Sequence, residues 1–223
     1  QTRYFAHRGF AVLAPDLPGH GLSGGAPLTS IGDMADWIDG LLASLGVAQA
    51  TLVGHSQGVL VALETASRHP ERVAALTLIA GAMAIPVNDA LIDMSQSAPE
   101  KAFRMMTSWG HGPGAHKFDN TQPGHAFLGY GRRVMAQNDG AALHADLVAC
   151  NSYDGGKDAA ASVTQPSLCL LAGKDKMTPV KFGRKMAEQI SGAQCHVFER
   201  AGHFLPAEFP IEVNDAMAAF LSR

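Results

Sequence analysis

Short runs of apolar residues, each bounded by glycine, proline or polar residues, recur along most of the chain. Runs of this length between turn residues are typical of buried strands in a parallel sheet. They lie at Ala11–Ala14, Ala50–Gly54, Val73–Ala80, Pro166–Gly173 and Gln194–Phe198. The pattern therefore predicts five strands.

Stretches with apolar residues at helical spacing separate these runs. Ile31–Leu45, Ser56–His69 and Pro210–Leu221 are expected to be helices. Thr178 followed by Pro179 predicts the start of another helix, with the threonine as its N-cap. Strands that alternate with helices of this length indicate βαβ units, so we expect an α/β fold with a mostly parallel sheet and helices on both faces.

The stretch Ala82–Ala161 breaks this alternation, because it contains no run that reads as a buried strand. Ser97 and Glu100 have the spacing of a capping box at the start of a helix. Two further helical segments are expected near His125–Asn138 and Gly140–Tyr153. We predict that residues 82–161 form a helical cap, inserted into a core that is built from residues 1–81 and 162–223.

Composition narrows the class of protein. With 47% hydrophobic and 17% charged residues, the 223-residue chain can bury the core of one α/β domain. The formal net charge is −3, and no basic stripe favours a nucleic-acid partner. The sequence contains no run of 18 apolar residues, so it predicts no membrane-spanning helix.

The number and spacing of the cysteines, and the residues with which the sequence starts, help to predict where the protein is located. The three cysteines are odd in number and form no close pair, which favours a reducing compartment and a cytoplasmic protein. Gln1 opens directly onto what resembles the last turn of a helix. We therefore expect a fragment of a longer protein, and a signal peptide upstream stays open as an alternative.

The segment Gly54-His55-Ser56-Gln57-Gly58 carries the strongest chemical signal. It matches G-x-S-x-G between a predicted strand and a predicted helix, where the turn forces the serine into a strained conformation and exposes its hydroxyl. The Gln57 amide lies at the start of the helix, so it is a candidate oxyanion donor. Ser56 is therefore a candidate nucleophile.

A serine hydroxyl needs a base, and the base needs an orienting carboxylate. His203 follows the last predicted strand and Asp175 follows the strand before it. Both would lie at the carboxyl edge of a parallel sheet, where open α/β sheets bind their ligands. We predict that Ser56, Asp175 and His203 form a triad, with His203 within hydrogen-bonding reach of the other two.

From Phe10 to its end the sequence resembles the α/β-hydrolase superfamily. The resemblance rests on PDLPGHGLSGG, GHSQG, LLAGKDKMTP and AGHFLPAEFP, which occur in this order. It implies the same roles for Ser56, Asp175 and His203 and the same oxyanion donor, Gln57. It is far less specific for a substrate.

The sequence also departs from that superfamily. Its members carry three further strands at the start and a His-Gly loop that gives a second oxyanion donor, and this chain has neither. The resemblance places a missing strand between those expected at Ala11 and Thr51. We therefore expect either a gap beside the Ala11 strand or direct pairing of the two strands.

The expected activity is hydrolysis of a carboxylic ester or related acyl bond of a small-molecule substrate, without a cofactor or metal. Acyl transfer, carbon–carbon bond hydrolysis and perhydrolysis use the same triad and stay open, as does a ligand-binding relative without activity. His55, Met83, Trp109 and Phe204 are tentative substrate contacts. His20 is interpreted as a residue that shapes the PGHG turn.

Overall fold

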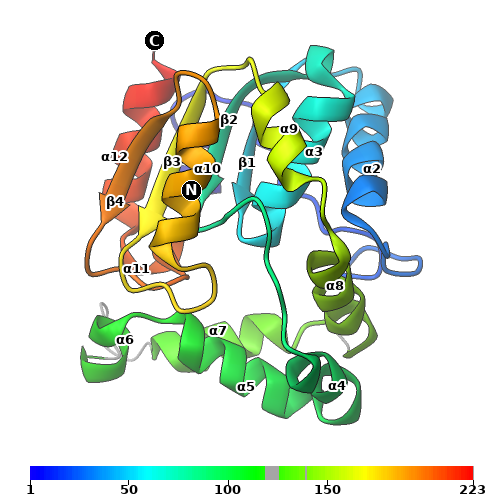
Figure 1. Cartoon of the computed structure of the whole chain (residues 1–223), viewed down its shortest axis with the longest axis vertical. Coiled ribbons are helices and arrows are strands. Elements are labelled where there is room, and N and C mark those ends of the chain that lie inside the picture. Colours follow the sequence, from blue (N-terminus) through cyan, green and yellow to red (C-terminus); the bar gives the residue numbers. More distant parts are fainter. Residues whose placement is uncertain (119–125, 139, 223) are drawn as a thin grey trace.

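Four strands form one parallel sheet in the computed structural model, which describes residues 1–118, 126–138 and 140–222. The strands are β1 (Ala50–His55), β2 (Val73–Ile79), β3 (Ser167–Ala172) and β4 (Gln194–Phe198). Each strand pairs with the next along the chain, in the order β1-β2-β3-β4. Parallel neighbours need a crossover between them, and helices supply it, so all four strands end at the same edge (Figure 1).

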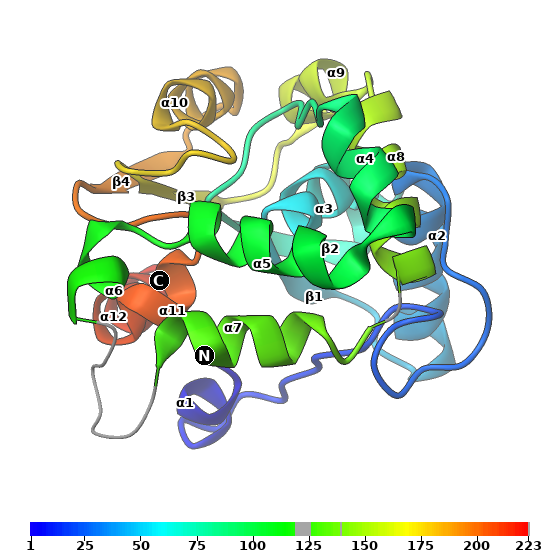
Figure 2. The same ribbon diagram turned by 90° about the horizontal axis from the view of Figure 1, so that it is seen from below.

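Helices cover both faces of the sheet (Figures 1 and 2). One face packs against α3 (Gln57–Arg68), α9 (Gly156–Ser162) and α10 (Val180–Gln189). The other face packs against α1 (Thr2–Ala6), α11 (Leu205–Glu208) and α12 (Pro210–Leu221). Helix α2 (Ile31–Ser44) packs against α3. The sheet is thus the middle layer of an α/β structure.

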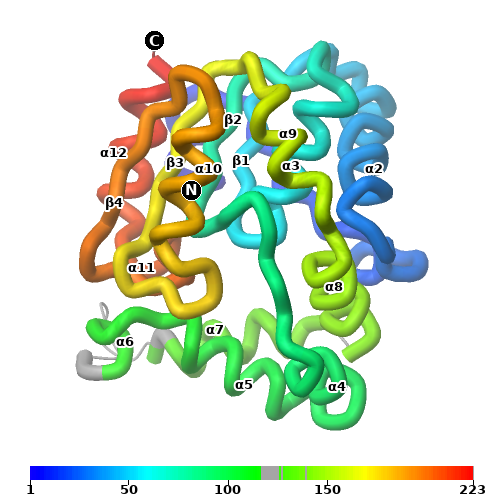
Figure 3. Tube along the Cα trace, in the orientation of Figure 1, coloured from blue at the N-terminus to red at the C-terminus, as the bar shows by residue number. Residues whose placement is uncertain are grey.

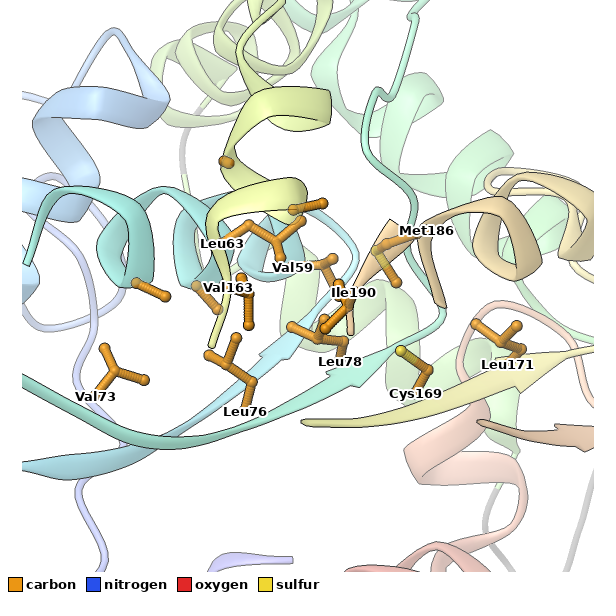
Figure 4. Close-up of a cluster of buried hydrophobic side chains, with 14 residues drawn as sticks. Val59, Leu63, Val73, Leu76, Leu78, Val163, Cys169, Leu171, Met186 and Ile190 are labelled. Carbon is orange, nitrogen blue, oxygen red and sulfur yellow. The ribbon is translucent and has the colours of Figure 1, made fainter. Parts of the chain in front are cut away.

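Strand β3 shows how one strand serves both faces. Successive side chains of a strand point to opposite sides, and all six residues of β3 are buried. Cys169 and Leu171 belong to the cluster under α3, α9 and α10, which Figure 4 shows. Leu168 and Leu170 belong to the cluster under α12. A strand buried on both faces reads as a continuous apolar run, which is why it was visible in the sequence.

Five helices lie across the edge at which the strands end (Figures 1 and 2). They are α4 (Asp89–Ser97), α5 (Pro99–Gly110), α6 (Pro113–Phe118), α7 (Phe127–Met135) and α8 (Gly140–Ser152). One connection runs down from β2 to α4, and another returns from α8 to α9 (Figure 3). Helix α9 packs in the core, so the layer over the edge, which we call the cap, ends with α8. The division of the chain into two domains stays a prediction.

The strand predicted at Ala11–Ala14 is wrong. These residues have no regular secondary structure, and Leu13 is 52% exposed. The run therefore does not pair directly with β1, whose outer edge has no neighbouring strand in the described ranges and whose Val53 is 50% exposed. A strand exists only where a partner completes its backbone ladder, and an apolar run in the sequence cannot reveal whether that partner is present.

The predicted capping box is also wrong. Ser97 is the last residue of α4, and its hydroxyl donates to the carbonyl of Asp93 at 2.9 Å. Helix α5 starts at Pro99 and has no side-chain cap. The proline fixes the start of the helix without one, because the first helical residue needs no N–H donor. Of the helices in the described part of the chain, none is both long enough and apolar enough to cross a membrane.

Candidate active site

Ser56 lies at the sharp turn between β1 and α3. Its backbone has φ 56° and ψ −118°, a conformation that costs a non-glycine residue about 1–3 kcal/mol. A side chain at Gly54 would collide with the backbone of Gly58, so the glycine permits the turn. The Ser56 N–H donates to the carbonyl of Ile79 at 3.1 Å, which ties the turn to the neighbouring strand. Ser56 lines a cavity together with residues of the cap.

His203 and Asp175 form a buried pair. The His203 Nδ1 lies 2.8 Å from the Asp175 Oδ2, and the two side chains are 3% and 0% exposed. A carboxylate oxygen only accepts, so Nδ1 carries the proton and Nε2 is left with its lone pair. This is the tautomer that a general base requires.

Thr178 supports the Asp175 carboxylate. The backbone N–H groups of Met177 and Thr178 each donate to Asp175 Oδ1 at 2.8 Å, and the Thr178 hydroxyl lies 2.8 Å from Oδ2. Burial acts to raise the pKa of Asp175, but the hydrogen bond and charge of His203, with the Thr178 bonds, outweigh it and lower the pKa. The carboxylate is therefore ionised beside His203.

The expectation that Thr178 is an N-cap is wrong. Helix α10 begins at Val180, and the Thr178 side chain instead lies between Asp175 and the carbonyl of Ala80, each at 2.8 Å. Sequence reasoning missed this role, because the threonine before Pro179 fits a helix start equally well.

His55 fixes the backbone of the histidine loop. Its Nε2 donates to the carbonyl of His203 at 2.7 Å, and the two rings lie 4.8 Å apart. Burial, and then the charge of His203, lower the pKa of His55 to about 4, so His55 is neutral near pH 7. His55 thus holds the backbone of His203 in place. It does not line the cavity, so it is not placed as a substrate contact.

The predicted bond between Ser56 and His203 is absent from the hydrogen bonds of the described residues. Such bonds are often long without a ligand and tighten when substrate binds. The structure therefore brings together His203 and Asp175 and places Ser56 at the same edge of the sheet, whereas the complete triad stays a prediction.

A cavity of about 310 Å³ lies between Ser56 and the cap. Ser56 and Gln57 form its floor, and much of its wall is apolar. The apolar wall includes Ile85, Leu91, Phe103, Met106, Trp109, Met135, Leu143 and Leu147. Of the tentative substrate contacts, Trp109 lies in this wall. Met83 packs in the core and Phe204 against His111 instead, so neither lines the cavity.

His20 has a role that sequence reasoning missed. Its Nε2 lies 3.0 Å from Asp146 Oδ2 and its Nδ1 lies 3.0 Å from the carbonyl of Pro18. Both partners only accept, so both bonds form together only in the doubly protonated ring. The bond to Asp146 raises the pKa of His20 against the effect of burial. His20 thus joins the PGHG loop to cap helix α8, and both residues line the cavity.

The His20–Asp146 pair predicts a pH-dependent stability. Because the pKa of His20 is raised in the folded chain, its stabilisation is full below its ordinary pKa and is lost as pH rises through the raised value. His20→Gln should cost about 0.5–1 kcal/mol at about pH 5.5 and nothing at about pH 9. Urea unfolding at both pH values measures this. His116→Gln, at an exposed residue that bonds a backbone carbonyl, is the control, and a pH-independent loss in His20→Gln contradicts the prediction.

Thr178→Val is expected to lower kcat about 10-fold, because the Asp175 carboxylate loses a donor and orients His203 less firmly. Thr65→Val is the matched control, since the buried Thr65 hydroxyl bonds the carbonyl of Val61 in its own helix. Both variants should lose about 1–2 kcal/mol of unfolding free energy. Equal kcat values for the two variants would show that Thr178 has only a structural role.

One group in the described part of the chain has the geometry to hold a metal ion, formed by Asp39, His69 and Glu71. Asp39 already pairs with Arg72 at 2.6 Å, and His69 bonds Asp36 at 2.8 Å. None of these residues lines the cavity beside Ser56.

Comparisons with known proteins agree with this architecture. Residues 2–216 match the model of the alpha/beta hydrolase family. A pimeloyl-[acyl-carrier protein] methyl ester esterase of Neisseria meningitidis serogroup B is 30% identical over 206 residues, which are 86% of this chain and 75% of that protein. A 2-hydroxymuconate semialdehyde hydrolase of Pseudomonas putida is 28% identical over 88% of this chain and 72% of its own.

Among solved structures, the enol-lactonase of Burkholderia xenovorans superposes with a TM-score of 0.85 at 21% identity, over 93% of this chain and 79% of that one. That likeness shows the fold. With the family match over nearly the whole chain and a parallel sheet that carries a strained serine at its carboxyl edge, this chain belongs to the alpha/beta hydrolase family and is a hydrolase.

Proposed function

We propose that this hydrolase cleaves a carboxylic ester or related acyl bond through an acyl-enzyme formed on Ser56. The observation that carries the proposal is the His203–Asp175 pair. It fixes the proton on Nδ1 and leaves Nε2 as a base, at the sheet edge where Ser56 faces the cavity.

Acylation begins when the Ser56 Oγ attacks the substrate carbonyl carbon while His203 Nε2 takes the hydroxyl proton. Negative charge then develops on the carbonyl oxygen. The Gln57 N–H, at the free first turn of α3, stabilises this charge. His203 next gives the proton to the leaving alkoxide, so the alcohol departs and the acyl group stays on Ser56.

Deacylation repeats these steps with water as the nucleophile. His203 takes a proton from water, hydroxide adds to the acyl carbon, and the proton returns to the Ser56 oxygen as the carboxylic acid leaves. Asp175 remains ionised throughout and stabilises the imidazolium, because its pKa is lowered in the folded chain.

The cavity supports a substrate of small to medium size with an apolar portion. Its volume of about 310 Å³ is at the lower end of small-molecule sites, and its cap side is mostly apolar. The name of the methyl ester esterase describes cleavage of an acyl–oxygen bond, which favours an ester for this chain as well.

Labelling with a fluorophosphonate tests the proposal. Ser56 Oγ should displace fluoride and form a covalent phosphonyl ester, which peptide mass spectrometry locates. Ser152→Ala, at an exposed serine of α8, should label like the parent chain. A relative that only binds ligands would leave Ser56 unmodified, and labelling elsewhere would remove Ser56 as the nucleophile.

Hydrolysis of p-nitrophenyl esters of increasing acyl length measures how long an acyl chain the cavity can hold. We expect kcat/KM to rise with chain length and then fall once the acyl chain exceeds the space under the cap. Substitution of Trp109 by alanine, which removes part of the apolar wall, should move the optimum toward longer chains. An unchanged length profile would show that the acyl chain binds elsewhere.

A further inference from the structure

The segment that carries His203 lies directly against a segment of the cap. The Phe204 N–H donates to the carbonyl of Gly110 at 3.2 Å, and the Phe204 and His111 rings lie 4.7 Å apart. A side chain at Gly202 would collide with the backbone of Gly112. The two backbones therefore touch over residues 110–112 and 202–204, with a glycine at the point of closest approach.

One carboxylate joins these two segments. Glu208 Oε2 accepts from the N–H of Gly112 in the cap at 2.9 Å, and its two oxygens lie 3.1 and 3.2 Å from the N–H of Gly202. Gly202 is the residue immediately before His203. Hydrogen bonds to a charged group are among the stronger ones, so the position of His203 depends on the position of the cap.

We propose that Glu208 is a positioning residue that fixes His203 against Asp175 by clamping the histidine loop to the cap. The inference rests on the proposed function, because positioning matters for the reaction only if His203 is its base. The clamp also links the cap to the chemistry: if residues 110–112 move away, Glu208 loses its bond to Gly112, Phe204 loses its bond to Gly110, and His203 loses part of its support.

Glu208 has no other evident task in the described structure. It does not line the cavity, and both of its oxygens are directed at the two backbone N–H groups. Burial raises its pKa, the two N–H bonds act to lower it, and Asp175 lies close enough for its charge to contribute. The carboxylate thus lies just outside the candidate triad.

The test compares Glu208→Ala with Glu208→Gln. The alanine removes both bonds, whereas a glutamine with its carbonyl oxygen at the Oε2 position keeps an acceptor for both N–H groups. Its NH₂ then takes the Oε1 position and has to rotate away from the Gly202 N–H, which is also a donor. We expect Glu208→Ala to lose about 10–100-fold in kcat, since a displacement near 1 Å is enough for that, and Glu208→Gln to keep its activity within about threefold. Glu212→Ala, at an exposed carboxylate on α12, should have no effect.

One readout separates positioning from simple stability. In proton NMR, the Nδ1–H signal of His203 should weaken or shift in Glu208→Ala and persist in Glu208→Gln. An unchanged signal, or equal kcat losses in the two variants, would overturn the proposal.

A second variant serves if Glu208→Ala does not fold. A side chain at Gly112 would lie 2.7 Å from both Glu208 Oε2 and the Gly202 nitrogen, so Gly112→Ala separates the segments while it leaves Glu208 intact. It should show the same loss and the same NMR change, and full activity would overturn the clamp. If the parent chain neither hydrolyses esters nor labels, the proposed function fails, and the NMR comparison still decides the role of Glu208.

Discussion

Ser56→Ala is expected to lower kcat for ester hydrolysis by about 10⁶-fold, or about 8 kcal/mol of transition-state stabilisation. Without the Oγ no acyl-enzyme forms, and the Gln57 amide and the cavity alone retain only a small residual rate. Steady-state assay with a p-nitrophenyl ester, after removal of any contaminating esterase, measures this loss. Fluorophosphonate labelling should disappear in the same variant.

Stability provides the control for this variant. Ser56→Ala keeps the Cβ and therefore the backbone strain at φ 56°, so its unfolding free energy should match that of the parent chain. Ser56→Gly removes the Cβ and should gain about 1 kcal/mol while it is equally inactive. If Ser56→Gly is inactive but more stable than the parent chain, the strained backbone at residue 56 is maintained for function. If Ser56→Ala keeps activity within a few-fold of the parent chain, Ser56 is not the nucleophile.

The sequence predicts β3 well because burial on both faces gives it a continuous apolar run, whereas β4 is partly exposed and is indicated by the turn residues around it. The bounds Gln194–Phe198 and Pro210–Leu221 agree with the structure at both ends. The Ala11–Ala14 run has the same appearance but no partner strand. The local sequence pattern indicates which secondary structure a segment favours, whereas strand pairing depends on which segments lie beside it in space.

The candidate site likewise contains residues that the sequence indicates and residues that only the structure reveals. Ser56, Asp175 and His203 could be predicted as candidates because each follows a strand that ends at one edge of the sheet. Thr178 and Glu208 are missed because a threonine before a proline and a glutamate in a helix have ordinary local explanations. Their roles arise from contacts with Ala80 and Gly112, which are distant in sequence. Contacts of this kind leave no periodic signal.

The His20–Asp146 pair shows most directly that sequence patterns do not reveal contacts between distant residues. The two residues are 126 positions apart, and neither motif nor spacing connects them. They meet because α8 returns over the PGHG loop after the chain has passed through the whole cap. A sequence-based interpretation could assign His20 only to its own turn.

Asp175→Asn is expected to lower kcat about 10⁴-fold with little change in fold. The two backbone N–H groups of Met177 and Thr178 donate to Oδ1 at 2.8 Å, so they hold the carbonyl oxygen of an asparagine at that position. The amide NH₂ must then take the place of Oδ2 and face His203 Nδ1. Two donors cannot face each other, so His203 shifts its proton to Nε2 and can no longer accept the proton of Ser56.

The same geometry explains why the fold should survive. Thr178 Oγ can accept from the new NH₂ while it donates to the carbonyl of Ala80, so no buried polar group is left without a partner. The expected result is therefore a chain that melts near the parent temperature, binds substrate with a similar KM and turns over about 10⁴ times more slowly. Asp89→Asn, at an exposed carboxylate in the first turn of α4, is the matched control and should be fully active. If Asp175→Asn retains activity within a few-fold, another carboxylate orients His203, and the position of Glu208 behind the histidine loop makes it the residue to substitute next.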